Sequence, residues 1–175
     1  MANRFILNET SYHGAGAIKS IADEAKGRSF KKAFVCSDPD LVKFGVTKKV
    51  LDVLDGAGLP YELYSNIKPN PTIENVQTGV EAFKASGADY IVAIGGGSPI
   101  DAAKAMWAFY EYPEVTFEQL CTPFSFPKLR QKAKFVAIPS TSGTATEVTA
   151  FSVITDYAKG IKYPLADFEI TPDVA

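Results

Sequence analysis

The sequence predicts an α/β fold, a Rossmann-like parallel sheet with helices on both of its faces. Short apolar runs alternate with helical patterns along most of the chain, and this alternation is typical of β-α-β units in a parallel sheet. One apolar run, residues 90–94, leads directly into the residues GGGS and then into a helical pattern. A strand, a glycine turn and a helix in that order are typical of open parallel sheets.

Turn residues and apolar runs place the elements of the first half. A short polar turn separates residues 5–7 from residues 12–13, which favours a hairpin before the sheet. Residues 32–37 are apolar at their centre and end at Asp38, as expected for the first parallel strand. The same patterns predict helices over residues 17–26, 47–55 and 74–86 and a short strand over residues 61–64.

The second half continues the alternation. A helix over residues 98–108 follows the glycine turn, with Ser98 suited to the N-cap and Pro99 to the first helical position. Residues 111–132 are rich in proline, aromatic and charged residues without clear periodicity, so we expect a surface excursion there. Residues 135–138 return as a strand.

Composition favours one domain over residues 1–175. With 46% hydrophobic and 22% charged residues, a chain of this length buries roughly 70% of its unfolded surface. A net charge of −2 without a run of lysine or arginine argues against a nucleic-acid surface, and no apolar stretch approaches the length of about 18 residues that a membrane helix needs. Cys36 and Cys121 are too few for a disulfide framework and form no metal-type pair. Since the N-terminus is too polar for a signal peptide, we expect a cytoplasmic protein.

The glycine turn has the features of a phosphate-binding site. Glycines have no Cβ, so the backbone N–H groups of Gly96 and Gly97 can approach a ligand closely. The dipole of the following helix adds partial positive charge where these amides point, and the Ser98 hydroxyl can reach the same oxygen. A tight strand-to-helix turn without a ligand is the alternative interpretation.

Asp38 lies at the C-terminal end of the first expected strand, where ligands bind in open parallel sheets. A carboxylate there can accept two hydrogen bonds from an adenosine ribose diol, and its charge would repel a ribose phosphate, which favours NAD over NADP. The competing interpretation is a turn residue in the sequence SDPD. The order also departs from the GxGxxG fingerprint, since the glycine turn follows the acid by about 57 residues.

Two loops carry further polar groups. Residues 139–147, PSTSGTATE, place hydroxyl side chains around Gly143, and short hydroxyls beside exposed amides suit a ribose, a pyrophosphate or a carboxamide. Asn70 lies between two prolines, so a backbone with little freedom presents its amide. An ordinary polar loop and a plain rigid connector are the alternatives for the two segments.

Together these features resemble the iron-dependent (group III) alcohol dehydrogenase family, and within it the lactaldehyde reductases, also called propanediol oxidoreductases. The resemblance runs through essentially the whole chain. It rests on the opening MANR-ILNET, the segment at residues 45–59, PNPTI at residues 69–73, SGADYIVAIGGGSPID at residues 86–101, and EVT followed by VITD at residues 147–156.

The resemblance implies a Rossmann-like N-terminal domain of the dehydroquinate synthase-like fold that binds NAD. It places Asp38 on the adenosine ribose and Asn70 near the nicotinamide. In the family the hydroxyl loop usually reads TTxGTxSE, whereas here Ser140 replaces the first threonine and residues 145–146 read Ala-Thr. The other residues that it assigns are Gly96, Gly97 and Ser98 to the pyrophosphate, Asp101 to support of the turn, Ser140, Thr141 and Thr144 to the stretch from adenine to pyrophosphate, and Lys162 to a ribose hydroxyl.

The same family holds a divalent metal, iron or zinc, with one aspartate and three histidines of a C-terminal helical domain, and this metal polarises the substrate oxygen. The present chain has one histidine, His13, which we expect at the surface, and it stops at Ala175, before the segment of the aspartate ligand. The resemblance therefore implies an NAD(H)-binding domain that lacks the metal-binding domain and is inactive alone. Full-length relatives would transfer hydride between NAD and a small alcohol or aldehyde.

Partners follow from the same resemblance. Family members exchange an N-terminal strand between subunits, which implies a homodimer through residues 4–8, and a complementing C-terminal domain is the other expected partner. The main alternative is a catalytically inactive nucleotide-binding or dimerisation module. The tail, residues 161–175, is apolar enough that we expect an exposed apolar face. A glycerol dehydrogenase or dehydroquinate synthase type shares the GGGS turn, but PNPTI and the hydroxyl loop count against it.

Overall fold

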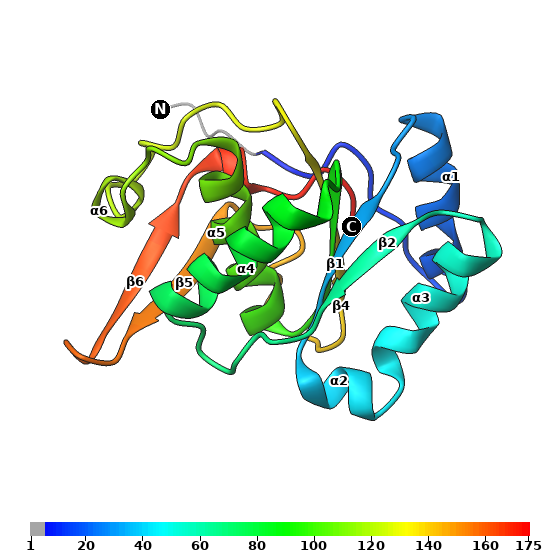
Figure 1. Cartoon of the computed structure of the whole chain (residues 1–175), viewed down its shortest axis with the longest axis horizontal. Helices are drawn as coiled ribbons and strands as arrows, with labels where there is room; N and C mark the ends of the chain where they lie inside the picture. The colour runs from blue at the N-terminus through cyan, green and yellow to red at the C-terminus, as the bar shows by residue number, and fades with distance from the viewer. Residues whose placement is uncertain (1–5) are drawn as a thin grey trace.

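A four-stranded parallel sheet forms the centre of the chain in the computed structural model, which describes residues 6–175 (Figure 1). The strands span Ala33–Cys36 (β1), Tyr61–Tyr64 (β2), Tyr90–Gly95 (β3) and Lys134–Pro139 (β4). They lie in the order β2-β1-β3-β4, and every neighbouring pair is parallel. This arrangement confirms the predicted α/β class, and it brings the carboxyl ends of all four strands to one edge of the sheet.

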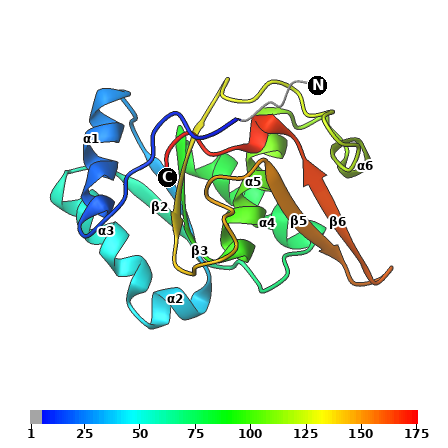
Figure 2. The ribbon, with the colours of Figure 1, turned by 180° about the vertical axis from the view of Figure 1, so that it is seen from behind.

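Helices cover both faces of the sheet, as predicted. They span Ser20–Gly27 (α1), Pro39–Lys43 (α2), Val46–Gly56 (α3), Ile73–Ser86 (α4), Gly97–Glu111 (α5) and Phe117–Leu120 (α6), with 3-10 turns at Ala17–Lys19 and Phe168–Ile170. Successive side chains of a strand point to opposite faces, so Phe34 and Ile91 pack with α4 and α5, whereas Val35 and Val92 pack with α1 and α3. The two helix pairs lie on opposite sides of the sheet in Figures 1 and 2.

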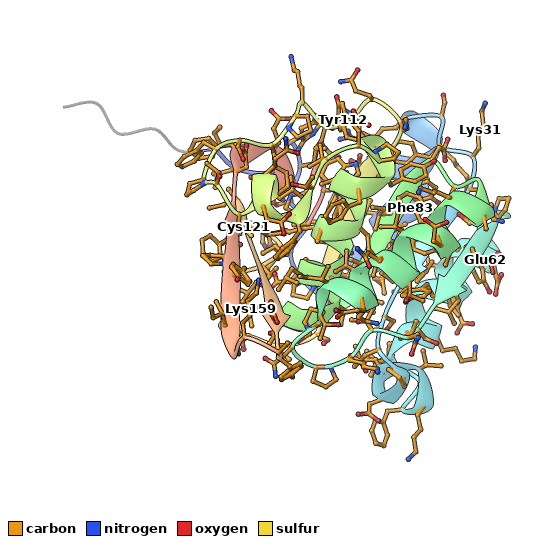
Figure 3. The ribbon with its side chains drawn as sticks, turned by 60° about the vertical axis from the view of Figure 1, so that its left-hand side comes forward. Lys31, Glu62, Phe83, Tyr112, Cys121 and Lys159 are labelled. Carbon is orange, nitrogen blue, oxygen red and sulfur yellow. The ribbon has the colours of Figure 1, made fainter. Side chains whose placement is uncertain are left out.

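Stacked aromatic rings fix α4 and α5 on the sheet. Phe83 of α4, labelled in Figure 3, stacks on Phe34 of β1 with ring centroids 4.7 Å apart and on Tyr110 of α5 at 3.8 Å. Such pairs contribute about 0.5–1.5 kcal/mol each beyond the area that they bury. The glycine-rich start of α5 therefore belongs to a helix that is firmly packed against the strands.

An antiparallel hairpin, which the sequence analysis did not predict, lies beside α5. Its strands β5, Phe151–Asp156, and β6, Ile161–Ala166, pair along their whole length. The Thr155 amide of β5 donates a hydrogen bond to the Pro71 carbonyl at 2.8 Å. The hairpin is thereby joined to the loop that carries Asn70.

The later part of the apolar tail covers the core of the protein and is not the exposed face that the sequence predicted, whereas Ile161 at its start is 44% exposed. Leu165 and Ile170 are fully buried in the same apolar cluster as α5, because β6 returns the chain toward that helix. Nearer the end, Val174 makes parallel bridges with both Val136 of β4 and Thr10.

The predicted N-terminal hairpin is wrong for the described residues. Phe5 lies outside them, and residues 6–7 and 12–13 form no strand. The C-terminal segment takes up the backbone groups of this stretch instead: the backbone N–H of Thr10 donates to the Asp173 carbonyl at 3.2 Å, that of Tyr12 donates to the Ala175 carbonyl at 2.8 Å, and the Thr10 carbonyl accepts from the Ala175 amide at 3.0 Å. His13 is exposed, as predicted.

The segment at residues 111–132 is more than the predicted surface excursion. It contains the short helix α6, and Leu120 and Leu129 are buried. The buried Glu111 carboxylate accepts hydrogen bonds from the backbone amides of residues 130–133 and from the Trp107 indole. One carboxylate at the end of α5 thus orders a stretch that lacks periodicity.

In the described part of the chain, no helix is long and apolar enough to cross a membrane.

Candidate functional site

A cleft of about 310 Å³ opens at the carboxyl edge of the sheet, where β1, β3 and β4 end. We call it the Asp38 cleft. Three segments selected from the sequence meet in it: Asp38 after β1, the glycine turn after β3, and Ser140 and Thr141 after β4. Asp40 and Lys68 add charged side chains to its lining.

The glycine turn forms the start of α5, but not in the register that the sequence predicted. The helix begins at Gly97, and its N-cap is Gly96 and not Ser98. The extended backbone of Gly96 (φ −78°, ψ −156°) starts the helix without a side-chain cap, so within residues 6–175 no capping side chain satisfies the first N–H groups of α5. The uncapped N-terminus of a 15-residue helix combines free donors with the positive end of the helix dipole, which suits an anion.

The three glycines of the turn have different reasons to lack a side chain. A Cβ on Gly95, whose φ is +155°, would lie 2.5 Å from the Pro99 ring, and a Cβ on Gly96 would lie 3.2 Å from the Thr141 hydroxyl oxygen. Packing alone therefore favours glycine at these two positions. A Cβ on Gly97 would make only ordinary contacts, at 3.7 Å from Thr144 Cγ2 and Thr146 Oγ1, so packing alone does not require glycine there, and its absent side chain leaves the backbone accessible to a ligand.

A second cleft of about 600 Å³ lies between α5, the hydroxyl loop and β5, and we call it the Thr144 cleft. The predicted residues Asp101 and Thr144 line it, together with Thr146 of the same loop and Thr149, which follows the loop. Gly97 lines both clefts. An extended ligand that crosses Gly97 would therefore contact both of them.

Hydrogen bonds bring Asn70 and Lys162 to the same place. The backbone N–H of Asn70 donates to Ser98 Oγ at 3.2 Å, and Lys162 Nζ on β6 donates to the side-chain oxygen Asn70 Oδ1 at 2.9 Å. Asn70 has φ +50°, a left-handed conformation that asparagine tolerates better than most residues. All the site residues selected from the sequence thus lie in or beside the two clefts.

Both acidic site residues also have structural roles. Asp38 Oδ1 accepts a hydrogen bond from the Leu41 amide at 2.8 Å and caps α2, so the turn interpretation of SDPD holds for one of its two oxygens. Asp101 was predicted to support the glycine turn, but its Oδ2 accepts a hydrogen bond from the Val153 amide at 3.2 Å and so supports β5. Burial raises the pKa of the Asp101 carboxyl, while the Val153 amide and the Lys104 ammonium oppose that rise.

Lys104 is the residue of this region that the sequence analysis missed. It is fully buried on α5, and its Nζ donates to the carbonyl oxygens of Thr146, Thr149 and Phe151 at 2.7, 2.6 and 2.9 Å. Burial lowers its pKa and the Asp101 carboxylate raises it; three acceptors match the three hydrogens of the protonated amine. The signal in the sequence was a lysine inside the otherwise apolar stretch AAKAMWA.

The described residues do not fit the divalent metal of the family that the sequence resembles. Within residues 6–175, no three side chains of His, Cys, Asp or Glu gather into a set that could hold a metal ion. The clefts fit a dinucleotide better, because they offer an uncapped helix N-terminus, an open glycine backbone, hydroxyls and a carboxylate. We assign no step through a metal to these residues.

Comparison with known proteins identifies the family of the chain. The family model of iron-containing alcohol dehydrogenases matches residues 8–175. The chain is 54% identical over 172 residues to an NADPH-dependent butanol dehydrogenase of Clostridium saccharobutylicum, which covers 98% of this chain and 44% of that protein. It is 45% identical over 175 residues to the lactaldehyde reductase of Escherichia coli K12, which covers 100% of this chain and 46% of that protein.

Solved structures share the fold. A 1,3-propanediol oxidoreductase matches with a TM-score of 0.91 at 27% identity, over 99% of this chain and 45% of the other. Sulfoacetaldehyde reductase from Bifidobacterium kashiwanohense, solved in complex with NAD+, matches with a TM-score of 0.87 at 26% identity, over 100% of this chain and 46% of the other. The chain thus spans less than half the length of the relatives that it matches, and its fold is that of their N-terminal, Rossmann-like domain. The predicted family is confirmed, and this chain belongs to the iron-containing alcohol dehydrogenases.

Proposed function

We propose that this chain binds NAD across the two clefts and is the cofactor-binding domain of an alcohol dehydrogenase. The observation that carries the proposal is the uncapped start of α5, which lies between the Asp38 carboxylate and the hydroxyl loop. A pyrophosphate there would accept hydrogen bonds from the backbone amides of Gly97 and Ser98 and gain from the helix dipole. The glycines at positions 96 and 97 allow its oxygens to approach the backbone.

The two halves of the dinucleotide would extend from this point in opposite directions. The adenosine ribose would donate its hydroxyls to Asp38 in the Asp38 cleft, where Ser140 and Thr141 face the stretch toward the pyrophosphate. We place the nicotinamide on the side of Asn70, with Lys162 near a ribose hydroxyl and Thr144 beside the pyrophosphate. The hydrogen bond from Lys162 to Asn70 supports this grouping.

We propose NAD and not NADP as the preferred cofactor. The carboxylates of Asp38 and Asp40 line the Asp38 cleft with one lysine, Lys68, so a ribose phosphate would meet more negative than positive charge. A relative that is 54% identical to this chain is named as NADPH-dependent. Cofactor preference can therefore differ within the family and needs a direct measurement.

Small alcohols and aldehydes are the substrates that we propose for the assembled enzyme. This proposal takes its support from the names of the relatives, a butanol dehydrogenase and a lactaldehyde reductase. The chain's own contribution would be to bind and orient the nicotinamide ring for hydride transfer. A metal-bearing domain, as a complementing partner, would supply the iron or zinc and the remaining pocket, so we expect the present chain to bind the cofactor without turnover.

A second copy of the chain is the other proposed partner, through residues 4–8. Residues 4 and 5 lie outside the described part, and Leu7 of the same segment is 72% exposed. A dimerisation module without turnover is the second candidate function. Leu7→Ser should shift sedimentation from dimer to monomer, and a wild-type chain that sediments as a monomer would remove this partner.

We place the protein in the cytoplasm, and the two free cysteines support this proposal.

Calorimetric titration with NAD and NADP tests the proposed function. We expect saturable binding of NAD and binding of NADP that is about tenfold weaker, a difference of about 1.4 kcal/mol. Asp38→Asn keeps an acceptor for the Leu41 amide, whereas Asp38→Ala also loses the cap of α2, which costs about 1 kcal/mol. The asparagine variant should therefore keep its stability and lose the preference for NAD. A folded chain that binds neither nucleotide would refute the proposal.

A further inference from the structure

The buried lysine on α5 has no part in the contacts proposed so far. Among residues 6–175, Lys104 is the one lysine whose side chain is completely buried. All three of its hydrogen bonds go to backbone carbonyls, those of Thr146, Thr149 and Phe151. An apolar side chain of similar length would fill the same space at a lower desolvation cost. The ammonium group therefore contributes three hydrogen bonds that fix the positions of these three peptide groups.

The segment that it holds has little structure of its own. Residues 140–150 contain no helix or strand, and Ala145 has φ +53°, a conformation that residues with a Cβ rarely adopt. One hydrogen bond, from the Ser140 amide to the Gly95 carbonyl at 2.8 Å, ties the start of the segment to β3. At the other end, Lys104 ties Thr146 and Thr149 to α5, and Asn8 Nδ2 donates to the Glu147 carbonyl between them at 2.8 Å.

The stretch between these two anchors lies over the glycine turn. Thr144 Cγ2 and Thr146 Oγ1 both lie 3.7 Å from the position that a Cβ on Gly97 would occupy. Gly97 and Lys104 belong to the same helix, α5. The hydrogen bonds of Lys104 therefore fix the distance between the hydroxyl loop and the glycine turn. The width of the Thr144 cleft at Gly97 thus depends on a side chain that does not line the cleft.

We propose that Lys104 is a positioning residue of the cofactor site, which fixes Thr144 and Thr146 over Gly97 by holding the end of the hydroxyl loop. Its effect on the cofactor rests on the proposed function. Its effect on the loop does not, because that effect exists in the free protein. The two effects can be measured separately.

The test uses Lys104→Met, which keeps the length of the side chain and removes its three donors. We expect amide hydrogen exchange to speed up about tenfold or more at residues 144–151 and to stay unchanged in β3, since a local opening leaves the rest of the sheet intact. We expect NAD affinity to fall about tenfold. Lys104→Gln, which can still donate two hydrogen bonds, should fall between the wild type and Lys104→Met in both readouts.

A matched control separates positioning from general loss of stability. Val50 is fully buried between α3 and the sheet, in the other apolar cluster, and Val50→Ala should lower the melting temperature without changing NAD affinity or exchange in the loop. If Lys104→Met binds NAD and exchanges its loop amides as the wild type does, the proposal is wrong. If that variant does not fold, Lys104→Gln decides by the same two readouts. If the wild type fails to bind NAD, the proposed function fails, and the exchange at residues 144–151 still decides the role of Lys104.

Discussion

Replacing Gly97 by alanine separates the cofactor site from the fold. The new Cβ would lie 3.7 Å from Thr144 and Thr146, which is ordinary contact, and alanine is favoured over glycine within a helix by about 0.5–1 kcal/mol. For a chain of this size, 1 kcal/mol corresponds to about 2–4 °C. We therefore expect a melting temperature that is unchanged or a few degrees higher. At the same time, the methyl group would occupy the space of the pyrophosphate, so NAD affinity should fall about 10- to 100-fold, or about 1.4–2.8 kcal/mol.

The matched control is Gly79→Ala on α4. A Cβ there would lie 2.3 Å from Met106 Cε and 3.2 Å from Tyr64 Cε1, so the buried methionine must move, at a cost of about 1–3 kcal/mol, which the helix preference for alanine offsets by about 0.5–1 kcal/mol. We expect this variant to melt at a lower temperature than the wild type and to bind NAD as the wild type does. Thermal melting followed by circular dichroism, with calorimetric titration of NAD, measures both quantities. The reasoning is refuted if Gly97→Ala binds NAD normally, or if it loses as much stability as Gly79→Ala.

Three further outcomes are expected. Lys162→Met should leave the melting temperature unchanged, because the side chain is exposed, and should weaken NAD binding about three- to tenfold through loss of the contact with Asn70; equal affinity in a titration would remove Lys162 from the site. Glu111→Ala should lower the free energy of unfolding in urea by about 3–5 kcal/mol, because it strands several buried donors, and a loss below 1 kcal/mol would contradict that account of the segment after α5. A thiol reagent at pH 8 should modify Cys121 and spare Cys36 in the native chain, because Cys36 is fully buried and burial raises its pKa far more; rapid modification of both thiols would show that β1 opens.

Elements with an unbroken apolar pattern could be predicted from the sequence. The strand at residues 61–64 matches β2, and the helices at residues 47–55 and 74–86 match α3 and α4 to within one residue at each end. The β5–β6 hairpin could not be found in this way, because its strands break the expected pattern. Ser152 is a polar residue at a fully buried position of β5, and Pro164 lies within β6, although a proline in a sequence argues against a strand.

The site residues that follow parallel strands could be predicted from the sequence, whereas those positioned only by tertiary packing could not. Asp38 and the glycine turn follow two neighbouring parallel strands, and such strand ends meet at one edge. Lys104 gives no comparable signal, since a lysine in a helix is normally solvated, and its three acceptors are backbone carbonyls more than 40 residues further along the chain. The N-cap at Gly96 was likewise hidden, because Ser98 is the better capping residue by type.

The position of the dinucleotide on the start of α5 is the central claim, and nuclear magnetic resonance of the labelled chain tests it most directly. On titration with NAD, we predict that the backbone amide signals of Gly96, Gly97 and Ser98 shift most, with smaller shifts at Thr141 and Thr144. Shifts that are absent, or that gather on another surface such as the groove between α4 and α6, would contradict the account.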